Sequence, residues 1–295
     1  MSTAPPPGIY VPAILFFTPD EELDFPSIKT HLLRLAHAGV TGILVQGSNG
    51  EAQHLSREER SALIRHARSV LDEAGLDGKT EGKKRIVVMA GTGAQSTRET
   101  KILCKDAAEA GAEFALVLTP SVWPPLMSME AIIKFHRDDS TTLSVLAQHP
   151  NIVGAKLSCG QINKLHRLAS TQPPTSFAPF TGRADTLVPS LVCGAPGAIA
   201  ALPNIAPKAH VRAYELFREG KLAEAMEIQV MISHADWAIA STGGPVAGVK
   251  SIVSEHFGYG DSRPRGPLLP IDMQARARSD EGEWMRKLIQ FEKSL

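Results

Sequence analysis

The sequence predicts an α/β protein in which a parallel sheet is enclosed by helices. Short apolar runs of the kind that form buried parallel strands recur along the chain, and helical patterns separate most of them. This alternation is typical of a parallel sheet with helices outside it. The chain has 295 residues, 43% of them hydrophobic, which is enough for one large core. Barrels of this class often run past about 200 residues as a single domain, so the length does not require two domains.

Seven runs fit buried strands: Ile9–Leu15, Gly42–Gly47, Arg85–Gly91, Phe114–Pro120, Asn151–Leu157, Ser176–Gly182 and Gly197–Pro203. The ends of the intervening helices are also marked. Ser56 and Glu59 have the spacing of a capping box, and Ser96 and Glu99 repeat it. A glycine follows each of the first three helical patterns, at Gly39, Gly75 and Gly111.

The pattern beyond about Pro207 is helical without strands. It comprises Val211–Phe217, Leu222–Ala240 and a tail from Trp284. We therefore expect residues 1–206 to form the barrel, and residues 207–295 to form a C-terminal helical region packed on it within the same structural domain.

One strand is missing from this pattern, since a closed barrel of this class has eight. The apparent helix Met129–His136 runs almost directly into another, Ser140–Gln148, where the fifth strand belongs. Two explanations are open: the chain has lost this strand, or a segment is absent from the sequence. We favour the second, because excising a central strand would leave sheet edges and core unsatisfied. It predicts a Cα step much longer than about 3.8 Å between Phe135 and Ser140.

The bulk composition excludes several classes of function. Lys and Arg balance Asp and Glu at 31 each, which argues against nucleic-acid or acidic-lipid partners. The three cysteines are widely spaced and form no CxxC pair, so neither a disulfide framework nor a zinc site is indicated. No apolar run is long enough to span a bilayer, and the Pro-rich start lacks the apolar region of a signal peptide. We expect a cytoplasmic protein without a membrane partner, and import into an organelle stays open.

Lys156 is the first candidate for chemistry, because it ends the otherwise apolar run Asn151–Leu157. A lysine on a buried strand is costly unless it is paired or functional, and catalytic residues of barrels lie at the carboxyl ends of strands. A desolvated amine has a lowered pKa and can attack a carbonyl carbon. The alternative is a strand-end lysine whose ammonium reaches solvent.

The loop Gly47–Glu51, with the sequence Gly-Ser-Asn-Gly-Glu, follows the second strand directly. Its two glycines allow a tight turn with exposed backbone N–H groups, and Ser48 and Asn49 add side-chain donors. Such a loop suits a small carboxylate, although a simple turn would have the same composition.

Together these features resemble the dihydrodipicolinate synthase/N-acetylneuraminate lyase family of pyruvate-dependent class I aldolases, which are (β/α)₈ barrels. Gly47–Glu51 resembles the family's GxxGE loop, and Asn151–Lys156 resembles its Schiff-base strand. The likeness covers nearly the whole chain and includes Phe180–Asp185, Gly197–Asn204, Phe257–Gly260 and Pro264–Leu268. The loop and the run His149–Lys156 look most similar to 4-hydroxy-2-oxoglutarate aldolases and fungal 2-keto-3-deoxy sugar-acid aldolases.

The resemblance implies roles for particular residues. Lys156 would form the Schiff base. Ser48 and Asn49, with backbone amides near Gly47, would hold the pyruvate carboxylate, and Ala200 would line the pocket through its backbone. It further implies no metal and no cofactor, a small-molecule substrate made of a 2-oxo acid and an aldehyde, and a homotetramer or homodimer.

Departures from the family pattern bear on the substrate. Asn49 stands where many members carry a threonine hydroxyl of a proton relay, and Val122 stands at the apparent position of a tyrosine that reaches into the neighbouring subunit. Trp123 either walls the substrate channel or packs within its loop. We expect cleavage of 4-hydroxy-2-oxoglutarate or a 2-keto-3-deoxy sugar acid. Dihydrodipicolinate synthase activity and a non-catalytic binding barrel remain alternatives.

Two other barrel chemistries fit poorly. A metal-dependent aldolase needs converging ligands, but the histidines are scattered and none pairs at H-x-H spacing. A phosphate-binding barrel needs Gly-rich loops after strands seven and eight, which Thr181–Arg183 and Pro203–Asn204 do not supply.

Overall fold

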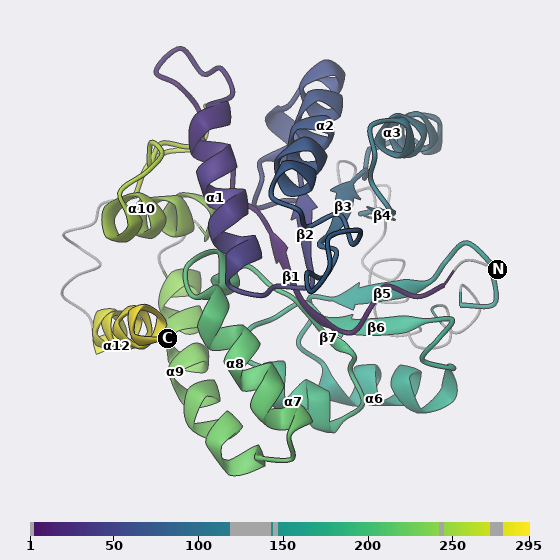
Figure 1. Ribbon diagram of the computed structural model, residues 1–295, viewed down its shortest axis with the longest axis vertical. Coiled ribbons are helices and arrows are strands. Elements are labelled where there is room, and N and C mark those ends of the chain that lie inside the picture. Colours follow the sequence, from purple (N-terminus) through teal and green to yellow (C-terminus); the bar gives the residue numbers. More distant parts are fainter. Residues whose placement is uncertain (1–2, 119–142, 144–146, 242–244, 272–279) are drawn as a thin grey trace, which may run out of the picture.

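A curled parallel sheet lies at the centre of the molecule (Figure 1). The computed structural model describes residues 3–118, 143, 147–241, 245–271 and 280–295. Its strands are β1 (Gly8–Pro12), β2 (Gly42–Val45), β3 (Val87–Gly91), β4 (Phe114–Leu116), β5 (Gly154–Leu157), β6 (Ala178–Thr181) and β7 (Gly197–Ile199). They pair in the order β4-β3-β2-β1-β7-β6-β5, with every paired register parallel. The seven predicted strands are thereby confirmed, each shorter than its apolar run.

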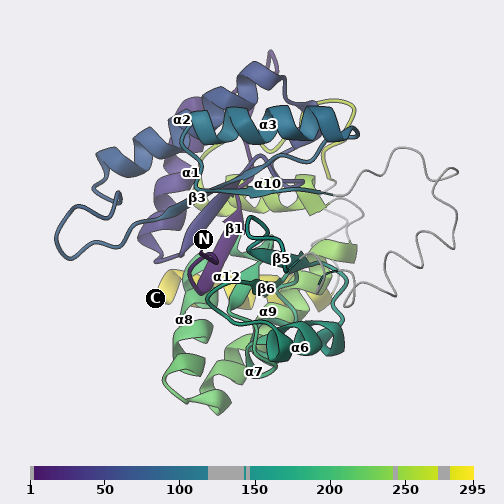
Figure 2. The same ribbon diagram turned by 90° about the vertical axis from the view of Figure 1, so that its right-hand side faces the viewer.

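Helices cover the sheet on its convex side. The first group comprises α1 (Phe25–His37), α2 (Arg57–Glu73) and α3 (Thr97–Glu109). The second comprises α6 (Ile162–Thr171), α7 (Leu187–Val192), α8 (Pro207–Arg218) and α9 (Leu222–Ser241). Figures 1 and 2 show the two groups on opposite sides of the strands, as expected for a curled sheet. Short 3-10 turns, η1 (Ala52–His54) and η2 (Leu202–Asn204), follow β2 and β7.

Local signals in the sequence fix the ends of these helices. Ser56 and Glu59 form the predicted capping box of α2, in which each side chain bonds the other residue's backbone N–H. Ser96 accepts a bond from the Glu99 N–H at the start of α3. The three predicted end glycines have positive φ, which side chains disfavour: Gly39, Gly75 and Gly111.

The apolar side chains separate into two main clusters on the two faces of the sheet. The larger contains outward-facing strand residues and the helices packed on them. The smaller draws its buried members from strands alone: Tyr10, Leu44, Val87, Met89, Ala178, Phe180 and Ile199. Since none of its buried members among the described residues comes from a helix, the smaller cluster marks the concave, inner face of the barrel.

In the described part of the chain, the C-terminal region is helical, as predicted, and it includes a helix that the sequence did not indicate. Beside α9 lies α12 (Asp280–Ser294), and α10 (Pro245–Phe257) was not anticipated. Its run Pro245-Val-Ala-Gly-Val249 is rich in small and β-branched residues, which lack a clear helical period. Within the described residues no helix has the length and apolarity needed to cross a bilayer.

The predicted strand shortfall lies between the two outermost strands of the sheet order, β4 and β5. The predicted Cα step between Phe135 and Ser140, the helix Met129–His136 and most of Ser140–Gln148 lie outside the described residues, as do Val122 and Trp123. These stay predictions.

Candidate functional site

Lys156 occupies the third position of β5, with Phe180 of β6 as its register partner. Gly154 pairs with Ala178 in the same way, two residues earlier. Because Ala178 and Phe180 both belong to the inner cluster and side chains alternate along a strand, Lys156 projects onto the inner face of the barrel. This placement agrees with the interpretation of Lys156 as a barrel-interior amine.

The Lys156 amine is half-buried, and burial lowers its pKa below the ordinary lysine value. Among the described residues no carboxylate opposes this shift, because desolvation is its only cause. At a given pH, the Lys156 amine is therefore neutral in a larger fraction of molecules than the amine of a free lysine is. The neutral amine is the form that attacks a carbonyl carbon.

The loop Gly47–Gly50 is a compact turn at the carboxyl end of β2. The Gly50 N–H donates to the Gly47 carbonyl at 3.0 Å, and the Glu51 N–H donates to the Ser48 carbonyl at 3.1 Å. Gly50 has to be a glycine, since a Cβ there would lie 2.9 Å from the Ala13 carbonyl oxygen. The loop is consequently held close to the end of β1.

Several donors of this loop are open. In the part of the chain that the structure describes, the backbone N–H groups of Ser48 and Asn49 donate to no carbonyl. The Asn49 side-chain nitrogen is buried without a hydrogen-bond partner there, whereas Ser48 is exposed. A buried, unpaired donor is rare in folded proteins and calls for an acceptor. A carboxylate would supply one, so the loop fits the anion that the sequence predicted.

All strands of the sheet are parallel, so their carboxyl ends share one edge. Lys156 stands near that end of β5, and the loop Gly47–Gly50 follows the same end of β2. Strand β2 lies four places from β5 in the sheet order, and the sheet curls, so the lysine and the loop face one interior from opposite sides. An inner-face nucleophile and an anion-binding loop are thus presented at one barrel mouth.

Ala200 follows β7, and its side chain is buried in the outer cluster. Its N–H donates to the Tyr10 carbonyl at 3.3 Å, which leaves the Ala200 carbonyl as the group available to a ligand. The geometry agrees with a contribution through the backbone. The role itself stays a prediction.

None of the three tyrosines is placed to exchange protons with Lys156. The Tyr10 hydroxyl donates to the Pro6 carbonyl at 2.8 Å, before β1 begins. The Tyr259 hydroxyl contacts His31 and Arg34, each at 2.7 Å. Tyr214 lines a cavity at the opposite end of the barrel. None of these three hydroxyls is therefore assigned a role in proton transfer at Lys156.

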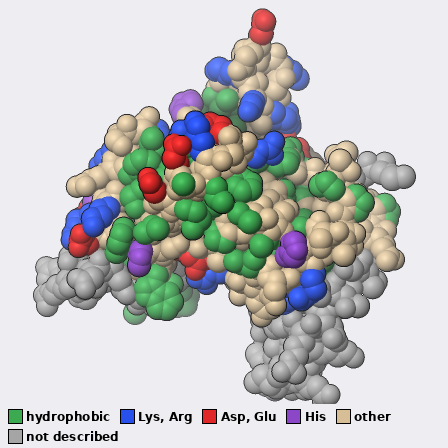
Figure 3. Space-filling model, turned by 90° about the horizontal axis from the view of Figure 1, so that it is seen from below, with side chains coloured by type: hydrophobic (Ala, Val, Ile, Leu, Met, Phe, Trp, Pro, Cys, Tyr) green, Lys and Arg blue, Asp and Glu red, His purple; other side chains and the backbone are tan. Residues whose placement is uncertain are grey.

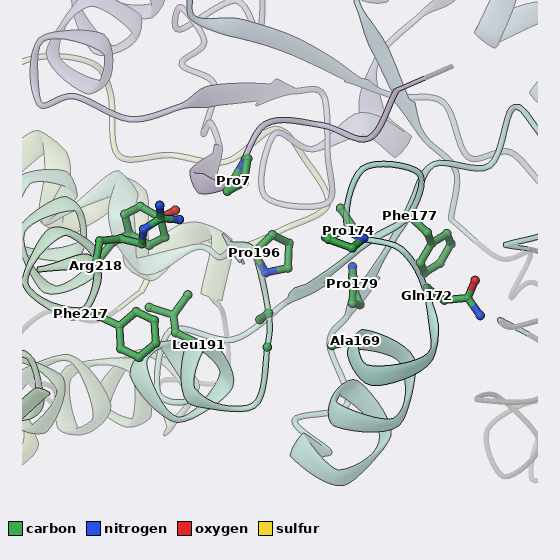
Figure 4. Close-up of a pocket in the computed structure, with 14 residues that line it drawn as sticks. Pro7, Ala169, Gln172, Pro174, Phe177, Pro179, Leu191, Pro196, Phe217 and Arg218 are labelled. Atoms are coloured by element: carbon green, nitrogen blue, oxygen red, sulfur yellow. The ribbon is translucent and has the colours of Figure 1, made fainter. Parts of the chain in front are cut away.

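That cavity has a volume of about 210 Å³ and lies at the amino ends of β1, β6 and β7 (Figure 4). Its lining is mostly apolar, with Pro7, Pro174 and Pro196 around it and Arg218 at one side. It holds neither Lys156 nor the loop, so it is separate from the candidate site. Within the described ranges, no three His, Cys, Asp or Glu side chains gather as a metal site would require.

The structure adds residues that sequence reasoning missed. Glu51 makes a buried ion pair with Lys250 of α10, at 2.8 Å. Asn204 of η2 accepts a bond from the Ile14 N–H at 3.1 Å and donates to the Pro12 carbonyl at 3.0 Å, which fixes the end of β1. One signal in the sequence could have revealed the pair. Lys250 is a charged residue next to an apolar run and Glu51 ends a glycine-rich loop, and charged side chains are rarely buried unless they are paired.

Comparison with known proteins places the chain among aldolases and synthases. The model of the Dihydrodipicolinate synthetase family matches residues 5–137 and 139–281. A probable mitochondrial 4-hydroxy-2-oxoglutarate aldolase of Emericella nidulans is 40% identical, covering 92% of each chain. An L-threo-3-deoxy-hexylosonate aldolase of Hypocrea jecorina is 38% identical, covering 98% of each.

Solved structures agree. A dihydrodipicolinate synthase family protein of Coccidioides immitis superposes with a TM-score of 0.80 at 32% identity, covering 99% of this chain and 98% of that one. A prophage protein of the same family from E. coli K12, solved with pyruvate, also gives 0.80, at 25% identity and coverage of 97% and 98%.

The matches also bear on the strand shortfall. The two segments of the family match break at residue 138, inside the stretch where the sequence is one strand short. An aldolase of Aspergillus niger aligns over 337 positions, more than this chain has residues. The break in the family match lies where the shortfall was predicted, and the missing segment stays a prediction. The extent of the match and the 32–40% identities confirm the resemblance read from the sequence: the chain belongs to the dihydrodipicolinate synthetase family.

Proposed function

We propose that this chain cleaves 4-hydroxy-2-oxoglutarate or a 2-keto-3-deoxy sugar acid to pyruvate and an aldehyde, through a Schiff base on Lys156. The chain is a lyase of the pyruvate-dependent aldolase type, as its family and its relatives at 35–40% identity indicate. The carrying observation is the half-buried Lys156 amine on the inner face, with a pKa lowered by burial.

The first steps follow from the chemistry of that amine. Neutral Lys156 Nζ attacks C2 of the 2-oxo acid, and loss of water gives a protonated imine. A base then takes the proton of the C4 hydroxyl, the C3–C4 bond breaks, and its electron pair passes to the imine nitrogen as an enamine. The C4 fragment leaves as the aldehyde. Protonation at C3 and hydrolysis release pyruvate and restore the amine.

The carboxylate of the substrate would be held by the loop. Ser48 and Asn49, with the backbone amides beside Gly47, supply the donors, and the Ala200 carbonyl would line the other side. The buried unpaired Asn49 amide supports this assignment. Asn49 cannot relay a proton as a hydroxyl does, so Ser48 is the hydroxyl available in the loop.

The alternative is a 4-hydroxy-tetrahydrodipicolinate synthase, the name of a relative in Methanoculleus marisnigri at 28% identity. The aldolase relatives are more similar to this chain than the synthase is, which favours cleavage of 4-hydroxy-2-oxoglutarate or a 2-keto-3-deoxy sugar acid. A non-catalytic binding barrel is a second alternative.

A substrate panel separates these functions. Purified protein is given 4-hydroxy-2-oxoglutarate and 2-keto-3-deoxy sugar acids, and pyruvate release is followed with lactate dehydrogenase and NADH. In parallel, pyruvate is supplied with glyoxylate, glyceraldehyde, N-acetylmannosamine or aspartate semialdehyde. We expect pyruvate release and little condensation with aspartate semialdehyde. Efficient formation of the cyclic product from the semialdehyde would favour the synthase, and no turnover or pyruvate adduct would favour a binding barrel.

A homotetramer or homodimer is the assembly that we propose. Hydrophobic side chains gather across the middle of the face seen in Figure 3, with charged side chains toward its rim. On α9, Trp237 is 60% exposed, and the exposed residues Leu222, Met226 and Val230 lie on the same face of the helix. Exposed apolar patches of this kind mark protein contacts, and analytical ultracentrifugation would give the mass of the assembly.

For location, the mitochondrial name of the Emericella nidulans relative supports an organelle as the alternative to the cytoplasm.

A further inference from the structure

Lys250 and Glu51 form an ion pair that is fully enclosed in protein. Lys250 Nζ lies 2.8 Å from Glu51 Oε1, and neither side chain has any exposed surface. Lys250 comes from α10, whereas Glu51 closes the loop after β2, so the pair joins segments 199 residues apart. A buried pair gains little net stability, because desolvating two charges offsets their attraction. Its position beside the carboxylate loop therefore points to a geometric role.

Further contacts fix both members of the pair. The other Glu51 oxygen accepts a bond from the Arg265 backbone N–H at 2.8 Å. Two cations lie near the Phe17 ring, with Lys250 Nζ 4.7 Å and Arg265 Cζ 4.4 Å from its centroid. The Glu51 carboxylate is thus bound from two directions by the C-terminal region, and it has little freedom to move.

The backbone of the loop needs such a restraint. Gln46 and Glu51, the residues on either side of Gly47–Gly50, have φ of 48° and 50°. This left-handed conformation is unfavourable for residues with a side chain, and it persists only where surrounding structure imposes it. At the Glu51 end, that surrounding structure is the ion pair with Lys250 together with the bond from the Arg265 N–H. Without it, Glu51 would be expected to relax toward negative φ and turn the preceding peptide groups.

Those peptide groups carry the open donors. The N–H groups of Ser48 and Asn49 come just before Gly50 and Glu51 in the chain. The unpaired side-chain amide also belongs to Asn49. A rotation at Glu51 would change the directions in which these donors point. We propose that Lys250 is a positioning residue that holds the loop Gly47–Gly50 in its carboxylate-binding conformation by fixing Glu51, without touching the substrate. This inference rests on the proposed function of the loop.

The test measures pyruvate binding separately from chemistry. Borohydride trapping at Lys156 is followed by mass spectrometry over a range of pyruvate concentrations, which gives a half-saturating concentration and a limiting rate. For Lys250→Met we expect the half-saturating concentration to rise about 10- to 100-fold, because displaced binding groups cost that much. The limiting rate should change little, since Lys156 itself is intact. Lys250→Arg, which keeps the charge, should restore much of the affinity.

A second variant guards against misfolding. Lys250→Met alone leaves Glu51 buried and unpaired, which is destabilising, whereas Glu51→Gln with Lys250→Met leaves no buried charge. The double variant should fold and show the same loss of pyruvate affinity. Arg68→Met is the matched control. Arg68 is 12% exposed, pairs with Asp72 and donates to the Ile86 carbonyl before β3, at the other end of the barrel. It should lose stability and keep its half-saturating concentration.

The outcomes separate the two proposals. An unchanged half-saturating concentration in the folded double variant overturns the role of Lys250 alone. A loss of affinity in Arg68→Met equal to that in the double variant does the same, since the effect would then follow general stability. If the unmodified protein forms no pyruvate adduct at Lys156, both the inference and the proposed function fail.

Discussion

Lys156 and Phe180 are direct register partners on adjacent parallel strands, so a phenylalanine stands next to the lysine on the inner face of the barrel. Phenylalanine offers an ammonium no hydrogen-bond acceptor, and burial on this face is what lowers the pKa of Lys156. This is the environment in which a lysine becomes a nucleophile at moderate pH.

The first prediction concerns the adduct. Pyruvate with borohydride should add mass at Lys156, and Lys156→Arg should abolish both the adduct and turnover, whereas exposed Lys29→Arg should change neither. Because burial lowers the pKa of Lys156, trapping should rise with pH and level off below 10.5, the ordinary lysine value. A modified peptide that contains a different lysine would contradict the assignment.

The second prediction concerns the loop donors. Ser48→Ala or Asn49→Ala removes a hydrogen bond to a charged carboxylate, which is worth about 1.5–3 kcal/mol. The half-saturating pyruvate concentration should therefore rise roughly 10- to 150-fold. Urea unfolding should show little change. Ser69→Ala, which removes the bond from the Ser69 hydroxyl to Glu73 on α2, is the control and should bind pyruvate normally. Unchanged affinity in both loop variants would reduce the loop to a turn.

The third prediction concerns Tyr10, the only tyrosine of the inner cluster. Its hydroxyl bonds the Pro6 carbonyl, so Tyr10→Phe should lower the free energy of unfolding by about 0.5–1.5 kcal/mol. Turnover should stay within about twofold, because no step at Lys156 uses this hydroxyl. A loss of kcat by orders of magnitude would show that Tyr10 acts in proton transfer after all.

The fourth prediction concerns His31, a fully buried imidazole between Asn204 and Tyr259. Burial lowers its pKa to about 3, with nearby Arg34 adding to the shift. The folded protein keeps it neutral, whereas the unfolded chain protonates it below about 6.5. Its contribution to stability is therefore complete above that pH and is lost as the pH falls toward 3, by about 1.4 kcal/mol per unit.

Urea unfolding between pH 7 and pH 4 tests this. The slope of stability against pH should be shallower in His31→Asn than in the unmodified protein. His37→Asn, at an exposed position of the same helix, should leave the slope unchanged. Equal slopes in all three proteins would show that His31 is protonated without cost.

Much of the fold follows from local signals. The seven strands were visible as apolar runs, since buried parallel strands have to be apolar on both faces. Capping residues and end glycines placed the ends of α1, α2 and α3, because those interactions span only a few residues. The sequence missed α10, whose small and β-branched residues form a helix only because tertiary packing supports it.

The site was predictable only in part. Lys156 and the loop Gly47–Glu51 each stand out against their surroundings, and the structure puts both at the carboxyl edge of the sheet. The partner of Glu51 could not be read, because Lys250 lies 199 residues away in the helix that had no clear pattern.

Glu59 shows how closely the C-terminal region and the barrel depend on each other. Its carboxylate caps the first turn of α2 through the Ser56 N–H at 2.7 Å, and it also receives the Arg265 guanidinium at 2.7 and 3.0 Å. Detaching the segment around Arg265 would weaken the cap of a barrel helix. The two regions should accordingly unfold in one cooperative transition, and a chain cut before α10 should expose α2 to early hydrogen exchange.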